Sequence, residues 1–267
     1  MINQGKGRII IRIGQNHLSF STIDPMQAEV PVTYAPYVMK SGISVPANLR
    51  EALSDADLQE MGYRKVLAMI DTPVLLVPIE QFEENSISVM YNQAFPRKGM
   101  DMVLYNVLSD LNAVSVFAIS KDLNTVLHDN FADVKMMPVM SPVWRHLHQR
   151  SFTGNRNKVY GYLHDRKLDI FSFQQNRFKF CNQFEAIRQQ DALYFLLYVW
   201  KQLMLDNETD EMHLVGSFAE MPELVNELRR YIQKVYVINP SAEFNRAPAT
   251  NIKDMPFDLM ALISKGR

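Results

Sequence analysis

The sequence contains a single cysteine, Cys181, among its 267 residues. One cysteine excludes an intramolecular disulfide and a zinc site built on cysteine thiolates. It is also in keeping with a reducing compartment, and we expect the protein to be cytoplasmic. Cys181 stands on an expected strand with Phe180 and Phe184 nearby, so we expect its thiol to be buried and not nucleophilic.

The sequence also has little net charge and lacks long hydrophobic runs. The formal charge of −1 gives no field of one sign that would attract nucleic acid, and we predict no nucleic-acid partner. The most apolar stretch, residues 192–200, is about half as long as a membrane span and is followed by Lys201. The N-terminal apolar run alternates like a strand and has no cleavage site after it, so we expect neither a signal peptide nor membrane insertion.

Common catalytic and metal-binding motifs are missing as well. The sequence has no G-x-S-x-G pattern, no P-loop and no Rossmann glycine pattern. His146 and His148 stand in a helical context, where residues two apart point in different directions, so we predict no metal site there. The acidic stretches 83–84 and 206–211 are typical of turns and helix caps.

The two halves of the sequence show the same order of expected strands and helices. Each half opens with three alternating strands and continues into alternating helices and strands. In the first half we expect helices near 45–62 and 80–91, a hairpin over 100–120 that turns at Ser109 and Asp110, and a helix capped by Ser120. In the second half we expect strands at 158–165, 167–175, 177–185, 211–217 and 234–240, and helices at 189–205, 221–232 and 256–264.

The predicted fold class is α/β, with two lobes joined at the polar stretch 153–157. We place the N-terminal lobe at residues 1–152, with an inserted subdomain around 41–100, and the C-terminal lobe at residues 153–267.

This tandem β-β-β-α-β-α order resembles the actin-like ATPase superfamily, which is built from two ribonuclease H-like lobes. The hairpins at 7–24 and 160–168 resemble the two phosphate loops. Residues 212–232 resemble the adenosine motif, with Gly216 and Ser217 in the turn and Pro222 in the helix that follows. Residues 103–142 resemble the actin-like protein of type IV pilus assembly and the cytoplasmic domain of a type II secretion protein. The whole chain looks like an uncharacterised bacterial family with this fold and no assigned activity.

The resemblance implies an acidic residue at the end of the first strand of each lobe, where carboxylates hold hydrated magnesium. Arg12 stands at the first of these positions, and the triplet 161–163, Gly-Tyr-Leu, stands at the second. Asp165 is nearby, but we expect it in the turn and not at the strand end. We therefore predict no catalytic residue, no metal site and no ATP hydrolysis.

The resemblance still allows the protein to bind a nucleotide without hydrolysing it. The candidate binding residues, in a cleft between the lobes, are Arg12, Gly14, Gly216 and Ser217. The alternative is structural: Gly14 makes a tight turn, Arg12 points to solvent or to an ion pair, and the turn at Gly216 and Ser217 is a close strand-to-helix connection.

Three functions follow, and the first is our main prediction. It is a non-catalytic actin-like protein that serves as a cytoplasmic interaction or scaffold module, binds a protein partner, forms a homodimer and needs no cofactor. The second is a regulator that binds a nucleotide without hydrolysing it. The third is a sugar-kinase-like enzyme, which needs an acidic general base that we do not find at a strand end. The sixteen methionines fit either a flexible core or an adaptable protein-binding surface.

Overall fold

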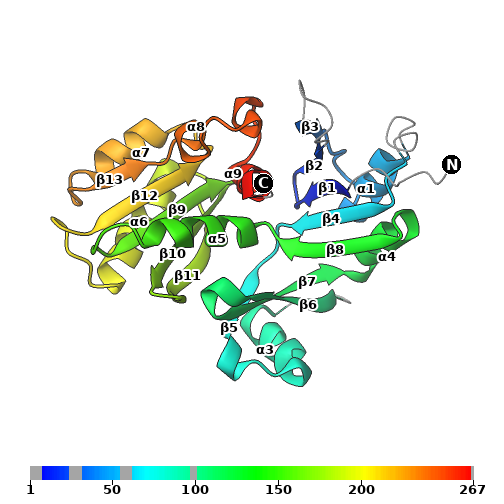
Figure 1. Ribbon diagram of the computed structural model, residues 1–267, viewed down its shortest axis with the longest axis horizontal. Coiled ribbons are helices and arrows are strands. Elements are labelled where there is room, and N and C mark those ends of the chain that lie inside the picture. The colour runs from blue at the N-terminus through cyan, green and yellow to red at the C-terminus, as the bar shows by residue number, and fades with distance from the viewer. Residues whose placement is uncertain (1–7, 24–31, 55–61, 97–100, 266–267) are drawn as a thin grey trace. The chain divides into compact units, whose positions relative to one another are not determined.

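The computed structural model describes residues 8–23, 32–54, 62–96 and 101–265 (Figure 1). The chain forms two compact units. Unit 1 comprises Met1–Ser109 and Ala113–Ser141, and unit 2 comprises Asp110–Asn112 and Pro142–Arg267. The main division thus falls between Ser141 and Pro142, within the first turn of helix α5, Met140–Ser151, whereas our sequence-based division at 152/153 assigned this stretch to the first lobe.

Unit 1 is built on a five-stranded sheet with the strand order β3-β2-β1-β4-β8. Strands β1, β2 and β3 pair antiparallel, as the expected meander, whereas β4 and β8 continue the sheet parallel to β1. The bounds of these strands are β1 Arg8–Ile13, β2 Leu18–Ile23, β3 Val32–Tyr37, β4 Lys65–Ile70 and β8 Asp133–Pro138.

Two helices form one hydrophobic core with this sheet: α1, Val45–Leu53, and α4, Lys121–Asn130. Both begin at a serine whose hydroxyl accepts a backbone N–H, Ser44 from Ala47 and Ser120 from Leu123. The cap predicted at Ser120 is therefore confirmed. The end of the helix predicted over 45–62 lies partly outside the described residues.

A smaller antiparallel sheet with the order β5-β7-β6 completes unit 1. Its strands are β5 Val74–Pro78, β6 Asp101–Leu108 and β7 Ala113–Ser120, and η3, Ser109–Leu111, joins the predicted hairpin. The helix expected over 80–91 is divided into η1 Ile79–Gln81, η2 Glu84–Ser86 and α3 Ile87–Ala94. We expected an inserted subdomain around 41–100; in the structure α1 and β4 belong to the main sheet layer, and the second sheet is built from residues between 74 and 120.

Unit 2 repeats the plan, with the strand order β11-β10-β9-β12-β13. Strands β9, β10 and β11 form an antiparallel meander, and β12 and β13 extend it parallel to β9. Their bounds are β9 Lys158–His164, β10 Lys167–Gln174, β11 Arg177–Glu185, β12 Glu211–Gly216 and β13 Val235–Val237. This repeated topology matches the predicted pair of ribonuclease H-like lobes.

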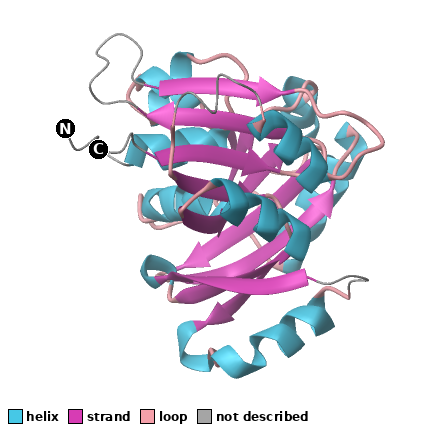
Figure 2. Ribbon diagram, turned by 90° about the vertical axis from the view of Figure 1, so that its right-hand side faces the viewer, coloured by secondary structure: helices cyan, strands magenta, loops and turns pink. Residues whose placement is uncertain are grey.

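Figure 2 shows helices lying beside the strands. The core on one face of the unit 2 sheet contains buried residues of α6, Gln189–Gln202, and α7, Met221–Leu228. Tyr162 of β9 faces away from that core, and its hydroxyl donates to Asp258 of α9, Phe257–Lys265. The remaining elements of this unit are α5 Met140–Ser151, α8 Pro240–Glu243 and η4 Pro248–Asn251. Within the described ranges, no helix is both long and apolar enough to cross a membrane.

Candidate functional site

The carboxyl ends of the parallel strands are where open α/β sheets bind ligands. In unit 1, Ile13 at the end of β1 pairs with Ile70 at the end of β4. Gly14 and Asp71 come directly after these strands, and the Asp71 N–H donates to the Ile13 carbonyl at 2.8 Å. This sheet edge therefore brings together one predicted residue, Gly14, and one that we did not predict, Asp71.

Gly14 is explained by the packing of its own hairpin. Its N–H donates to the carbonyl of His17 at 2.9 Å, which closes the turn between β1 and β2. A Cβ atom on Gly14 would lie only 1.9 Å from Cε1 of the His17 ring. The imidazole occupies the space that a Cβ atom would need, so the packing of His17 accounts for glycine at this position whether or not a ligand binds.

Arg12 is buried in the centre of the unit 1 sheet. Only 3% of its surface is exposed, so the alternative in which Arg12 points to solvent is wrong. Its neighbours Ile11 and Ile13 belong to the core formed with α1 and α4, and the alternation of the strand places Arg12 on the opposite face. A buried cation thus stands on the strand where the resemblance implies a metal-binding acid.

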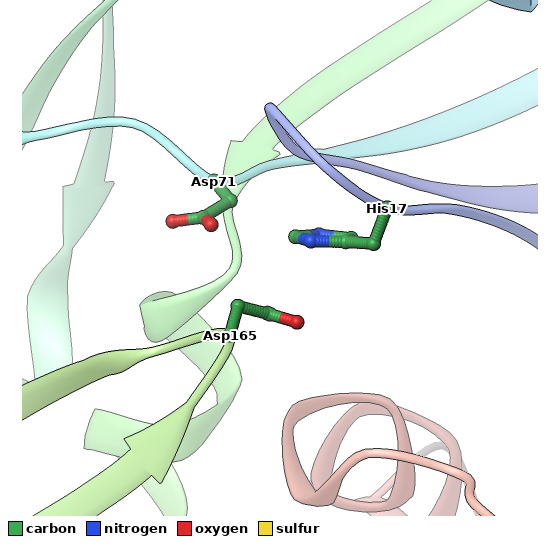
Figure 3. Close-up of side chains that lie close together, drawn as sticks. All are labelled: His17, Asp71 and Asp165. Atoms are coloured by element: carbon green, nitrogen blue, oxygen red, sulfur yellow. The ribbon is translucent and has the colours of Figure 1, made fainter. Parts of the chain in front are cut away.

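Asp71 is an acid at a strand end, contrary to our sequence-based statement that none is found. It is 8% exposed, and one of its carboxylate oxygens lies within 4.8 Å of a ring nitrogen of His17 (Figure 3). The segment after it is held in place, because the Thr72 hydroxyl donates to the Ala118 carbonyl at 3.1 Å and the Tyr91 hydroxyl to the Pro73 carbonyl at 2.9 Å. The sequence feature that could have identified Asp71 is an apolar run that ends in Asp-Thr-Pro.

In unit 2 the β9–β10 hairpin turns through Asp165 and Arg166. Both residues have positive φ values, 46° and 64°, as the central residues of a type I′ turn do. Asp165 therefore lies in the turn, as predicted, and not at the strand end.

The residue at the end of β9, His164, lies between two carboxylates. Its Nδ1 is 3.1 Å from Asp165 Oδ2, and its Nε2 is 2.8 Å from Asp169 Oδ2. Asp169 is buried and also accepts from Nε2 of Gln183, at 3.2 Å and 3.1 Å to its two oxygens. Both ring nitrogens of His164 can donate to these oxygens only if the ring carries both protons.

Tyr162 extends this buried polar network. Its ring stacks on that of His164 with a centroid distance of 4.5 Å, and its hydroxyl donates to Asp258 Oδ2 at 2.8 Å. Gly161, beside it, packs close to Leu214: a Cβ on Gly161 would lie 2.9 Å from the Leu214 Cδ2 atom. Of the triplet that replaces the second acid, Tyr162 thus belongs to a buried polar network, whereas Gly161 and Leu163 pack in the apolar core.

Gly216 and Ser217 form a close turn at the end of β12. Gly216 has φ +113°, and a Cβ there would lie 1.9 Å from the carbonyl oxygen of Leu163. The Ser217 N–H donates to that same oxygen at 3.1 Å. The approach of two backbones therefore requires glycine, as the structural alternative expects.

The four candidate nucleotide-binding residues are divided between the units. Arg12 and Gly14 belong to unit 1, and Gly216 and Ser217 belong to unit 2. Their binding of a nucleotide stays a prediction.

The remaining sequence candidates have structural partners. His146 Nε2 is 2.7 Å from Glu243 Oε1, and this hydrogen bond lowers the pKa of Glu243. His148 Nε2 instead contacts the carbonyl of Gln175 at 3.0 Å, so the two histidines diverge as predicted. Asp206 accepts backbone N–H groups of the 206–210 turn, which lower its pKa.

Cys181 and His213 are affected by burial. Cys181 is half-buried and not fully buried as we expected, but desolvation still raises the pKa of its thiol, which is in keeping with an inert cysteine. His213 is 5% exposed, stacks on Tyr160 at a centroid distance of 5.5 Å and packs against the tilted ring of Tyr236 at 5.2 Å. Desolvation lowers the pKa of His213, although its Nε2 lies 3.0 Å from Glu211.

Two solved structures with TM-scores above 0.5 support the predicted fold. A Bacteroides thetaiotaomicron VPI-5482 protein with an actin-like ATPase fold and unknown function is 27% identical, covers 99% of each chain and has a TM-score of 0.83. A structure of the PilM–PilN type IV pilus biogenesis complex is 11% identical, covers 96% of each chain and has a TM-score of 0.59. The cytoplasmic domain of EpsL, an inner membrane component of the type II secretion system of Vibrio cholerae, is 11% identical over 78% of this chain and 81% of its own, with a TM-score of 0.40.

A comparison with curated proteins gives no match. A family model, in contrast, matches residues 1–235. With this match over most of its length, the chain belongs to DUF3822, a family of proteins of unknown function.

Proposed function

We propose that this protein is a non-catalytic, cytoplasmic protein of the actin-like fold that binds other proteins. The observation that carries the proposal is the replacement of both strand-end acids. Arg12 is buried on β1, and on β9 the corresponding stretch contains Tyr162, whose hydroxyl is committed to Asp258. Without a carboxylate at either position, the metal ion and the attacking water would lack the anchors that the fold's ATPases use.

The two glycine turns also favour this proposal. The Gly14 N–H is already bonded to the His17 carbonyl, and the Ser217 N–H to the Leu163 carbonyl. Neither N–H is left to bind a phosphate without a rearrangement of its turn. A role in protein assembly has one precedent in this fold, since PilM has been solved in a complex with PilN.

A nucleotide-binding regulator is the second candidate, and Asp71 is the observation that favours it. Its carboxylate follows β4 at the ligand-binding edge of the unit 1 sheet and lies near a ring nitrogen of His17. A carboxylate oxygen is the kind of ligand that magnesium prefers, so Asp71 would hold the ion that accompanies a bound nucleotide.

A phosphate-release assay with ATP and magnesium separates catalysis from its absence. We expect the wild-type rate to equal that of a heat-inactivated sample and of the variants Asp71→Asn and Asp165→Asn. Turnover that one of these variants removes would overturn the proposal and identify the acid responsible.

A thermal-shift screen with ATP, ADP, GTP and cyclic dinucleotides tests the second candidate. A nucleotide present at 100 times its dissociation constant would add about 2.7 kcal/mol to the free energy of unfolding. Our proposal expects no shift. A shift that Gly14→Ala or Asp71→Asn removes would instead support the regulator.

A further inference from the structure

Helix α6 carries an aromatic surface that the core of unit 2 does not use. Tyr194 is 61% exposed and Tyr198 is 48% exposed. The two rings lie one helical turn apart and stack on each other with a centroid distance of 6.0 Å and an interplanar angle of 16°. Large exposed aromatic residues that lie side by side mark interaction sites more often than isolated ones do.

The opposite face of the same helix is fully committed to the core. Ala192, Leu196, Val199 and Trp200 are buried there. With 3.6 residues per turn, Tyr194 and Tyr198 point away from this core. Exposed apolar residues also flank the helix at both ends, since Ile187 is 52% exposed and Met204 is 92% exposed.

The sequence of α6, QQDALYFLLYVWKQ, is close to symmetric about Leu196. Tyr194 and Tyr198 lie two positions to either side of Leu196, and Asp191 and Lys201 lie five positions to either side. These last two are the charged residues of the helix, and their charges are opposite. An antiparallel pair of α6 helices related by a twofold axis would therefore place each Tyr194 near Tyr198 of the second copy and each Asp191 near Lys201 of the second copy.

We propose that the outer face of α6 binds α6 of a second copy of this chain, antiparallel and around a twofold axis at Leu196. Charge complementarity selects this occupant, because the same helix supplies the anion and the cation that the pairing needs. Ile187 would lie near Met204 of the second copy at either end. This inference goes beyond the proposed function, since it concerns α6 and would stand if the strand ends bound a nucleotide.

The size of the outer face of α6 determines the affinity that we expect for the dimer. A helix of this length is about 21 Å long, so one helix pair with its flanking residues lies at the low end of specific interfaces. We therefore expect a reversible dimer with a dissociation constant in the micromolar range.

Sedimentation velocity across a micromolar concentration series tests the dimer, with a reducing agent present because of Cys181. The wild-type protein is expected to shift from monomer to dimer as concentration rises. The double variant Tyr194→Lys/Tyr198→Lys is expected to stay monomeric. The control Val89→Lys, at a position of α3 that is 60% exposed, is expected to dimerise like the wild type. A wild-type monomer at every concentration, or a dimer that the double variant leaves intact, would overturn the proposal.

A charge-swap mixture tests the antiparallel arrangement itself. Asp191→Lys alone and Lys201→Asp alone would each bring like charges together in a homodimer, and each is expected to weaken it at least tenfold. A mixture of the two variants restores both opposite-charge pairs, so a heterodimer of near wild-type affinity is expected. Because Asp191 also accepts the Arg188 N–H at 2.9 Å, circular dichroism must first establish that the variant is folded. A mixture no stronger than the separate variants would overturn the antiparallel arrangement.

Discussion

The hairpin β1–β2 of unit 1 and the hairpin β9–β10 of unit 2 open equivalent sheets, but their turns are built differently. The first contains Gly14, whose missing side chain leaves room for the ring of His17. The second contains no glycine and turns through Asp165 and Arg166 at positive φ. The same topology is thus compatible with different turn chemistry, and the strand-end residues are free to differ in function.

The two units also differ in the polar groups that lie near their strand ends. Unit 1 places the buried Asp71 near His17 after β4, and unit 2 encloses His164 between Asp165 and Asp169. Three substitutions with their controls and one pH titration test this contrast, and they are given in order of decreasing expected effect on stability.

The largest effect is expected for Gly216→Ala. The new methyl group would meet the backbone oxygen of Leu163 at 1.9 Å, and a backbone atom cannot rotate away. We expect a loss of at least about 3 kcal/mol in the free energy of unfolding, measured by urea denaturation.

Gly154→Ala is the matched control for this substitution. Gly154 also has a positive φ, +76°, but a Cβ added there would meet no described atom within 4 Å beyond its own chain neighbours. Gly154→Ala should therefore lower the free energy of unfolding only by the cost of holding alanine at a positive φ, which is about 1–2 kcal/mol. Equal losses for the two variants would show that the contact with Leu163 is not the cause.

Asp169→Ala is expected to have the next largest effect. It removes a buried acceptor from both His164 and Gln183, which should cost about 3 kcal/mol. The comparison in unit 1 is Asp133→Ala, which breaks the half-exposed ion pair with Arg8 at 3.1 Å and should cost less than about 1 kcal/mol. Denaturation of both variants in the same buffer checks the difference, and a larger loss for Asp133→Ala would contradict it.

His213 should make the stability of the protein depend on pH. Its folded-state pKa is lowered by desolvation, so below the ordinary value of 6.5 the unfolded chain binds the proton more readily. Stability due to this group is therefore present above pH 6.5 and is lost as the pH falls below it, by at most about 1.4 kcal/mol per pH unit. His213→Gln should reduce this slope in thermal melts between pH 7 and pH 5, and an unchanged slope would exclude His213 as its source.

The smallest effect is expected for Gly14→Ala, because the obstacle is a side chain. The ring of His17 can rotate out of the way, so the expected loss is about 1 kcal/mol. In a His17→Ala background the same substitution should cost almost nothing. A double-mutant cycle measures this coupling, and a cost that does not change with His17 would contradict the packing explanation.

The order of elements was predictable because it depends on local periodicity. The three meander strands of each unit, the hairpin at Ser109 and the serine cap at Ser120 all follow from patterns within a few residues. The predicted helix over 189–205 ends at Gln202, and Met204 has a positive φ of 51°, a conformation that helical periodicity does not reveal.

The candidate site was less predictable because it depends on which strands become neighbours. Asp71 acquires its position only because β4 pairs with β1 and ends in the same register. Arg12 is buried although the alternation along β1 places it opposite the apolar core, so its burial could not be read from the local pattern. Both features depend on contacts between residues far apart in the sequence, about which local patterns carry little information.

Phosphate release from ATP in the presence of magnesium tests the central claim most directly, with Asp71→Asn measured in parallel. We predict that the wild type and the variant both release phosphate at the rate of the heat-inactivated control. Magnesium-dependent release by the wild type that Asp71→Asn abolishes would contradict the account and make this protein an active ATPase.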